Sequence, residues 1–153
     1  MASDPPTVVV VGAGQSGLAG ARAAQEAGLR PIVLEASGRP SGSWSNYYDS
    51  LTLFSPARYS SMPGYPFPGD PDRYPTKHEV ADYLASYADH LGVDLRINTR
   101  VEAVEPVGHG FVVHTPDETL PAGDCRRERD IRPPAPAAGR RSGILYRQMP
   151  SRR

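Results

Sequence analysis

Short apolar runs and glycines divide the first part of the chain. Thr7–Val11 is a run of β-branched residues that ends in a glycine, a pattern typical of a strand buried on both faces. Residues 14–27 then predict a helix with its apolar positions on one side and Gly28 as its stop. Residues 32–35 predict a second short strand. Together these segments form the parallel strand–helix–strand unit of about 30 residues.

A regular helical stripe marks the middle of the chain. Thr76, with Glu79 three residues later, has the pattern of a capping box, and Gly92 supplies a stop. Between them, apolar residues recur at the spacing of one helix face: Val80, Tyr83, Leu84, Tyr87 and Leu91. Because core packing accounts for both tyrosines, we interpret them as core residues rather than site residues.

Strand patterns return after this helix. Residues 93–97 predict a third strand, and residues 100–107 and 111–115 flank a glycine-containing turn, which predicts a hairpin. A further strand is expected near residues 119–120. The pattern over residues 5–124 therefore predicts an α/β domain with a strand–helix–strand unit and a β-hairpin or meander.

Two segments lack any period. Residues 36–75 are rich in Ser, Gly, Pro and Tyr, and a loop of that length in a compact domain is usually functional, so we expect it to lie beside a ligand. Residues 125–153 are mainly Arg, Pro, Ala and Gly. Since this segment has too few large apolar residues to bury a core, we expect it to be disordered.

Composition excludes several classes of protein. The longest apolar run, Val8–Val11, is far shorter than the roughly 20 residues that span a bilayer. Residues 1–7 contain no basic residue, so we expect no signal peptide. The single cysteine, Cys125, excludes a disulfide framework and a CxxC pair, and the four histidines lack metal-ligand spacing, so no metal site is expected. We expect a cytoplasmic protein.

The net charge of zero conceals an asymmetry. Residues 1–124 carry 15 acidic and 8 basic side chains, whereas residues 125–153 carry 9 arginines and two acids. A basic tail raises the alternative of a nucleic-acid-binding arm. Because this tail lacks interleaved aromatic residues and a supporting fold, we expect no nucleic-acid partner.

A glycine-rich turn joins the first strand to the first helix. Residues 10–17 read VVGAGQSG and contain GxGxxG in the strand–turn–helix context that the motif requires. Gly12 permits the tight turn, Gly14 lets the backbone approach a pyrophosphate, and Gly17 lets helix and strand pack closely. The helix start then offers free N–H groups to phosphates. This predicts a partial Rossmann-like fold of the FAD/NAD(P)-binding type.

Glu35 ends the second strand, 23 residues after Gly12. A carboxylate at this place accepts hydrogen bonds from ribose hydroxyls and disfavours a 2′-phosphate. The ligand of this loop is therefore expected to be FAD or NAD rather than NADP.

The glycine-rich turn and the residues around it resemble the amino-terminal FAD-binding segment of the flavin-containing (class B) monooxygenases. The resemblance begins with residues 8–36 and continues in residues 41–44, SGSW, which match the family's GGxW with the first glycine replaced. Residues 48–56 match the family segment that passes close to the flavin. Residues 65–68, YPFP, and 74–77, YPTK, are similar to the bacterial and plant auxin-forming branches.

The resemblance implies a set of FAD contacts. The candidate cofactor-binding residues are Gly12, Ala13, Gly14, Gln15, Ser16, Gly17, Glu35, Ser43, Trp44 and Ser55. Phe54 departs from the asparagine of many animal members, and it cannot donate that residue's hydrogen bond to the oxygenated flavin. No catalytic residue is assigned, since the groups that handle protons and oxygen lie mostly outside the matched segment.

The resemblance also implies an activity. In the full-length family NADPH, as co-substrate, reduces FAD, oxygen adds to form a C4a-peroxyflavin, and one oxygen atom passes to a small-molecule substrate. The alternatives are another FAD/NAD-dependent oxidoreductase, such as a disulfide reductase or an amine oxidase, and a non-catalytic truncated dinucleotide-binding module. The single cysteine argues against a disulfide reductase, and the SGSW and YPTK stretches argue against both enzymes.

Family members are longer, with a second GxGxxG for NADPH, and the strand ending in Ala-Ser-Gly or Ala-Thr-Gly that closes the FAD domain is missing here. Codons can be chosen for residues 125–134 that, when read in a frame shifted by one base, encode Val-Val-Ala-Ser-Gly-Thr-Phe-Gly-Arg-Pro. This peptide has the apolar strand and the Ala-Ser-Gly end that are missing. We therefore hypothesise that residues 125–153 are an out-of-frame reading, which resequencing the gene would test.

Without the missing strand, Val8–Val11 becomes an exposed apolar edge, so weak FAD binding and marginal folding are expected.

Overall fold

Two small sheets and two helices make up the described part of the molecule. The structure, a computed structural model, describes residues 5–124. The sequence expectations for residues 125–153, including the out-of-frame reading, lie outside the described residues. The elements follow in the order β1 (Thr7–Val11), α1 (Gln15–Glu26), β2 (Arg30–Leu34), α2 (Lys77–Leu91), β3 (Asp94–Arg96), β4 (Ala103–Val107), β5 (His109–His114) and β6 (Thr119–Asp124).

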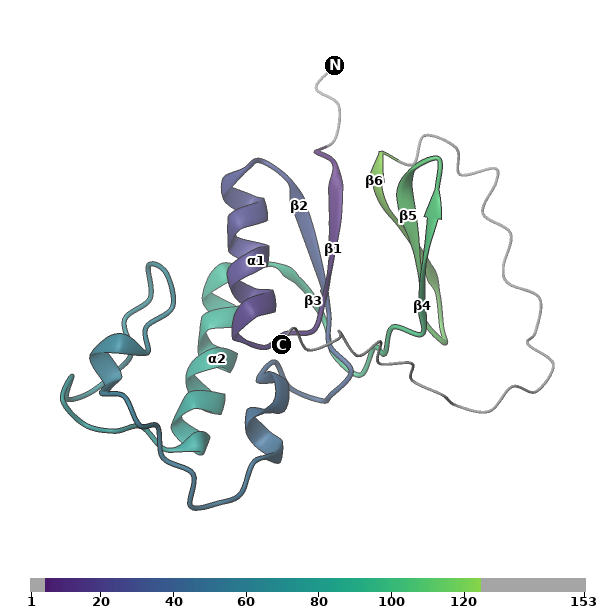
Figure 1. The fold of residues 1–153 in the computed structure, drawn as a ribbon. Helices are drawn as coiled ribbons and strands as arrows, with labels where there is room; N and C mark the ends of the chain where they lie inside the picture. The colour runs from purple at the N-terminus through teal and green to yellow at the C-terminus, as the bar shows by residue number, and fades with distance from the viewer. Residues whose placement is uncertain (1–4, 125–153) are drawn as a thin grey trace, which may run out of the picture.

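The first sheet is parallel and has the order β1-β2-β3. Val9 pairs with Ile32 and Val10 with Val33, so β1 and β2 run in register along their whole length. Helix α1 makes the crossover from β1 to β2, and α2 precedes β3. Both helices lie on the same side of this sheet (Figure 1).

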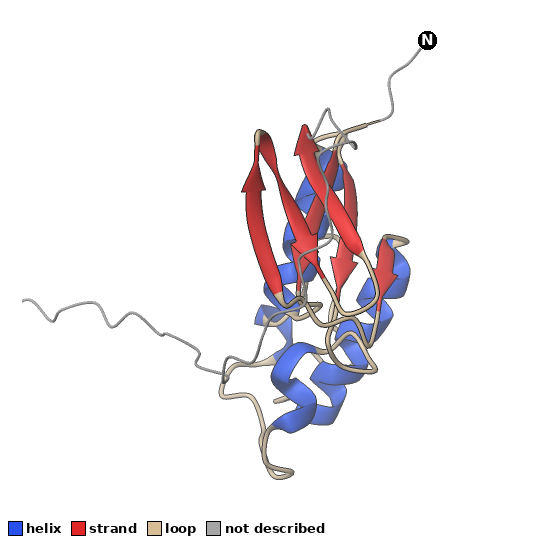
Figure 2. Ribbon diagram, turned by 90° about the vertical axis from the view of Figure 1, so that its right-hand side faces the viewer, coloured by secondary structure: helices blue, strands red, loops and turns tan. Residues whose placement is uncertain are grey.

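The second sheet is an antiparallel meander, β4-β5-β6, which covers the other side of the parallel sheet (Figures 1 and 2). Ile32 and Leu34 of β2 are buried against Val113 of β5 and Ala122 of β6. Because side chains alternate along a strand, the intervening Val33 points to the helices instead. The result is three layers: helices, parallel sheet and meander.

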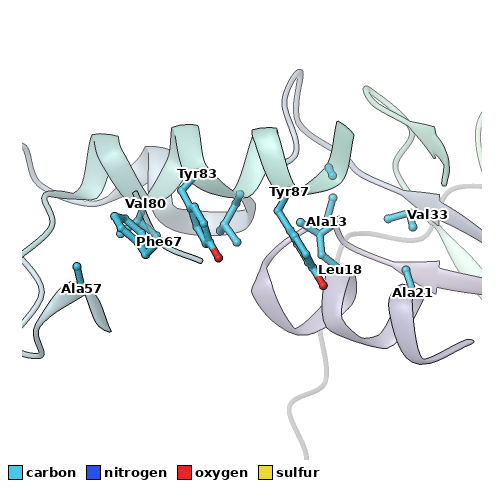
Figure 3. Close-up of a cluster of buried hydrophobic side chains, with 11 residues drawn as sticks. Ala13, Leu18, Ala21, Val33, Ala57, Phe67, Val80, Tyr83 and Tyr87 are labelled. Carbon is cyan, nitrogen blue, oxygen red and sulfur yellow. The ribbon is translucent and has the colours of Figure 1, made fainter. Parts of the chain in front are cut away.

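The larger core lies between the helices and the long loop. Leu18 of α1 lies beside Tyr87 of α2 and Ala21 lies toward Val33 of β2, while Phe67 and Ala57 of the loop pack near Tyr83 and Val80 (Figure 3). The loop contributes two short 3-10 helices, Gly42–Asn46 and Ala57–Tyr59. Residues 36–75, whose sequence shows no regular hydrophobic period, therefore form a loop that is packed against the core.

Helix α2 confirms its predicted signals. The Thr76 hydroxyl accepts from the Glu79 N–H, and the Glu79 carboxylate accepts from the Thr76 N–H at 2.8 Å, which forms both halves of the capping box. Gly92 ends the helix with φ of 60°. Four of the five predicted stripe residues are buried, and Leu91 is half-buried.

The meander and the first strand differ in detail from the sequence interpretation. The hairpin and the last strand are confirmed, but β6 runs over six residues rather than near residues 119–120 alone. The expectation that Thr7–Val11 is buried on both faces is wrong: the strand is half-buried and Val11 is 59% exposed. The reason is its place in the sheet, since among residues 5–124 β1 pairs only with β2.

Candidate functional site

The glycine-rich turn follows β1 directly and bends back onto β2. Gly12 has φ of 93°, a value that favours glycine, and its N–H donates to the Leu34 carbonyl at 2.7 Å. This bond extends the ladder of the parallel sheet by one residue. The chain then turns so that Gly14 occupies the N-cap of α1.

Two close approaches explain the other glycines. A Cβ on Gly17 would lie 1.9 Å from the Gly12 carbonyl oxygen, so no larger residue fits between the helix and the turn. A Cβ on Gly42 would lie 2.8 Å from the Gly14 Cα, which means that the long loop crosses the turn backbone to backbone. A Cβ on Gly14, by contrast, would make only an ordinary contact at 3.5 Å. Gly14 is therefore not required by internal packing.

Glu35 lies just behind the turn and is buried. Its Oε2 accepts from the Ala13 N–H at 2.7 Å, and its Oε1 accepts from the Ser37 N–H at 2.8 Å. Burial by itself would raise the pKa of Glu35, but these backbone donors stabilise the ionised form and hold the pKa below its ordinary value. The Ala36 N–H and the Ser37 hydroxyl also favour the ionised form, so the carboxylate is held mainly by the chain itself.

Trp44 anchors the long loop beside the helix start. Its Nε1 donates to Gln15 Oε1 at 2.6 Å, and its ring meets the ring of Tyr47 edge to face at 5.5 Å. The Ser43 hydroxyl donates to the Tyr47 hydroxyl at 3.2 Å. Three neighbouring loop side chains thus form one connected wall.

The turn, the helix start and this wall enclose a cleft of about 380 Å³. Its lining is polar and backbone-rich: Val11, Gly12, Gly14, Gln15, Ser16, Gly17, Ser43, Trp44 and Tyr47. The first turn of α1 carries no acidic residue, so the free N–H groups at its start face no competing negative charge. The arrangement can accept an anionic, phosphate-containing ligand.

The structure brings together most of the predicted cofactor-binding residues. Seven of the ten line the cleft: Gly12, Gly14, Gln15, Ser16, Gly17, Ser43 and Trp44. Ala13 is fully buried behind the turn, where its N–H donates to Glu35, and Glu35 is also buried and does not line the cleft. Ser55 does not line the cleft, and the neighbouring Phe54 is 96% exposed.

Sequence reasoning missed Tyr47 as part of the wall and Gly42 as the partner of Gly14. The glycine between two serines and before the tryptophan was a signal for a close backbone approach. No local pattern separates Tyr47 from Tyr48, because only the fold of the loop decides which ring faces the cleft.

The part of the chain that the structure describes, residues 5–124, holds no group of three or more His, Cys, Asp or Glu residues that could bind a metal ion. None of its helices is long and apolar enough to cross a bilayer. His78 and His90 are exposed on α2, and His109 and His114 lie in the meander, as predicted.

Comparison with known proteins places the chain in a family. Residues 9–125 match the family model described as pyridine nucleotide-disulphide oxidoreductase. An uncharacterised CzcO-like oxidoreductase of Geobacillus kaustophilus is 39% identical over 108 residues, which is 71% of this chain and 31% of that protein. An indole-3-pyruvate monooxygenase of Arabidopsis thaliana is 40% identical over 122 residues, 77% of this chain and 29% of that protein.

Solved structures give the same result. The flavin-containing monooxygenase from Stenotrophomonas maltophilia superposes with a TM-score of 0.72 at 37% identity, over 78% of this chain and 37% of that one. The chain spans about a third of the length of these relatives. It therefore belongs to the pyridine nucleotide-disulphide oxidoreductase family and corresponds to an amino-terminal portion of the family's flavin monooxygenase-type members.

Proposed function

We propose that this chain binds FAD in the cleft at the start of α1 and forms part of a flavin-dependent, NADPH-using monooxygenase. One observation carries the proposal: Gly14 faces the cleft without being required by internal packing, while Gly12 and Gly17 are required to shape the turn. A residue without a side chain at that position leaves backbone N–H groups open to a pyrophosphate.

The cleft residues have separate tasks in this proposal. The N–H groups at the start of α1 bind the pyrophosphate, and the Glu35 carboxylate behind the turn accepts from a ribose hydroxyl. Trp44 and Tyr47 shield the cofactor from water on the loop side. When bound, FAD would supply the redox chemistry of a monooxygenase, in which NADPH provides two electrons, one oxygen atom of O2 enters a small organic molecule and the other is released as water.

The relatives support this activity. One structural neighbour of 28% identity is a steroid monooxygenase bound to NADP, and the plant relative acts on indole-3-pyruvate. The 153-residue sequence contains a single GxGxxG. We therefore propose that the chain by itself binds FAD but does not turn over NADPH. A cytoplasmic location also remains part of the proposal.

The direct test is to titrate the chain with FAD and to monitor binding by the quenching of the fluorescence of Trp44, the only tryptophan. Gly14→Ala is the key variant because its methyl group fits the fold but would meet the phosphates. We expect it to keep the unfolding free energy and to weaken FAD binding about tenfold or more. Gly20→Ala, with nothing within 4 Å of the added Cβ, is the matched control. Absence of quenching in the unmodified chain, or equal affinity of Gly14→Ala, would refute the proposal.

A further inference from the structure

Lys77 is the only lysine of the chain, and its side chain is buried to 5% exposure. It occupies the first position of α2, where the helix dipole disfavours a cation, and burial of an ammonium group is costly as well. Partners of the ammonium group must therefore compensate for the unfavourable helix dipole and for the cost of burial.

The partners of Lys77 belong to the segment that forms the cleft wall. Its Nζ donates to the carbonyl oxygen of Tyr47 and lies 2.7 Å from Asp49 Oδ1. The Asp49 side chain is 92% exposed, so solvent screens this ion pair and it contributes little by itself. The partly buried hydrogen bond to the Tyr47 carbonyl is therefore the more important of the two contacts.

Backbone contacts strengthen the same junction. The Lys77 N–H donates to the Leu51 carbonyl at 2.9 Å, and the Leu53 N–H donates to the Pro75 carbonyl at 2.8 Å. These two bonds hold residues 51–53 against the start of α2. They do not reach Tyr47, whose main-chain position depends on the Lys77 ammonium and on a 3.4 Å bond to the Trp44 carbonyl.

We propose that Lys77 is a positioning residue for the cofactor cleft: its ammonium fixes the Tyr47 main chain so that the Tyr47 ring closes the wall beside Trp44. The inference rests on the proposed function. Lys77 does not line the cleft and is not expected to touch the cofactor. It acts from α2, 30 residues away in sequence, through the loop that separates it from the phosphate turn.

The test measures the FAD affinity of Lys77→Met and Lys77→Gln, each with Tyr47 intact and with Tyr47→Ala. We expect Lys77→Met to weaken binding about tenfold and Lys77→Gln, which keeps an N–H donor, about threefold. In the Tyr47→Ala background both effects should disappear, because residues that act through one another are not additive. His78→Gln, an exposed neighbour 3.9 Å from Asp49, is the control and should bind FAD normally.

The outcomes separate the two proposals. If the unmodified chain binds no FAD, the proposed function fails. If it binds FAD but the Lys77 variants weaken binding equally in both Tyr47 backgrounds, or in neither, the positioning role of Lys77 is wrong. Should Lys77→Met not fold, the same comparison with Lys77→Gln decides the question.

Discussion

The carboxylate of Glu35 accepts a hydrogen bond from the backbone N–H of Ala13 at 2.7 Å. This contact joins the end of β2 to the turn that follows β1, so the residue assigned to the ribose also holds the phosphate turn in place. In the proposed function, the shape of the cleft and the recognition of the ligand therefore depend on the same side chain.

Glu35→Gln should destabilise the fold by about 1–3 kcal/mol at neutral pH, since the NH2 group of an amide cannot accept the hydrogen bond that the second carboxylate oxygen accepts. The folded-state pKa of Glu35 lies below its ordinary value of 4.5, so the ionised group stabilises the fold above that pH. This contribution is lost as the pH falls through the folded-state pKa.

Urea unfolding at pH 7 and again below pH 4.5 would measure this effect. The difference between the unmodified chain and Glu35→Gln should shrink at the lower pH, whereas the exposed Glu102→Gln should show no difference at either. If the difference in unfolding free energy between the unmodified chain and Glu35→Gln increased at the lower pH, the stabilising role of the ionised Glu35 would be wrong.

Gly17→Ala should prevent the helix from packing on the turn. Its Cβ would lie 1.9 Å from a backbone oxygen, which cannot move without displacing Gly12. We expect a loss of about 1–3 kcal/mol or more in unfolding free energy, together with loss of FAD binding. Gly20→Ala on the same helix should instead stabilise the chain by about 0.5–1 kcal/mol. Equal stability of the two variants in urea would show that the close approach is absent.

Tyr83 holds the long loop through its hydroxyl. The Met62 N–H donates to this oxygen at 2.6 Å, and the hydroxyl itself donates to the Tyr65 carbonyl. Tyr83→Phe should therefore cost about 1–3 kcal/mol and leave the Met62 N–H without its acceptor. We expect proteolysis of the loop to accelerate as well.

Tyr87→Phe provides the comparison on the same helix. The Tyr87 hydroxyl makes one contact of 3.3 Å to the Pro63 carbonyl, and the guanidinium of Arg22 also donates to that oxygen. Loss of the Tyr87 hydroxyl should lower the free energy of unfolding by only about 0.5 kcal/mol. If the two variants unfold at the same urea concentration and are cleaved at the same rate, the anchoring role of Tyr83 is refuted.

Thr76→Ala should remove half of the capping box of α2 and cost about 1 kcal/mol. Because Lys77 is the next residue, fraying of this helix end should also loosen Tyr47 and weaken FAD binding. Thr76→Ser, which keeps the hydroxyl acceptor, should restore both quantities. Hydrogen exchange at the Glu79 N–H would detect the change directly.

Local signals predicted the helices most completely. The capping residues, apolar stripe and terminal glycine of α2 lie within 17 residues, so neighbouring positions alone specify its limits. The GxGxxG turn was predictable for a similar reason, since Gly12 supplies its own positive φ and Gly17 approaches backbone only five residues away. The burial of β1 could not be predicted from its own residues, because it depends on which strands flank it; its place at the edge was expected only from the family strand that is missing.

The candidate site divides along the same line. Short motifs in the sequence predicted the glycine-rich turn, the carboxylate of Glu35 behind it and the place of Trp44 in the long loop. The contact of Gly42 with Gly14, the choice of Tyr47 rather than Tyr48 for the wall, and the hydrogen bond from Lys77 to Tyr47 appeared only in the folded chain. The contacts of Gly42 with Gly14 and of Lys77 with Tyr47 join residues about 30 positions apart, and no local spacing encodes where a packed loop brings its side chains.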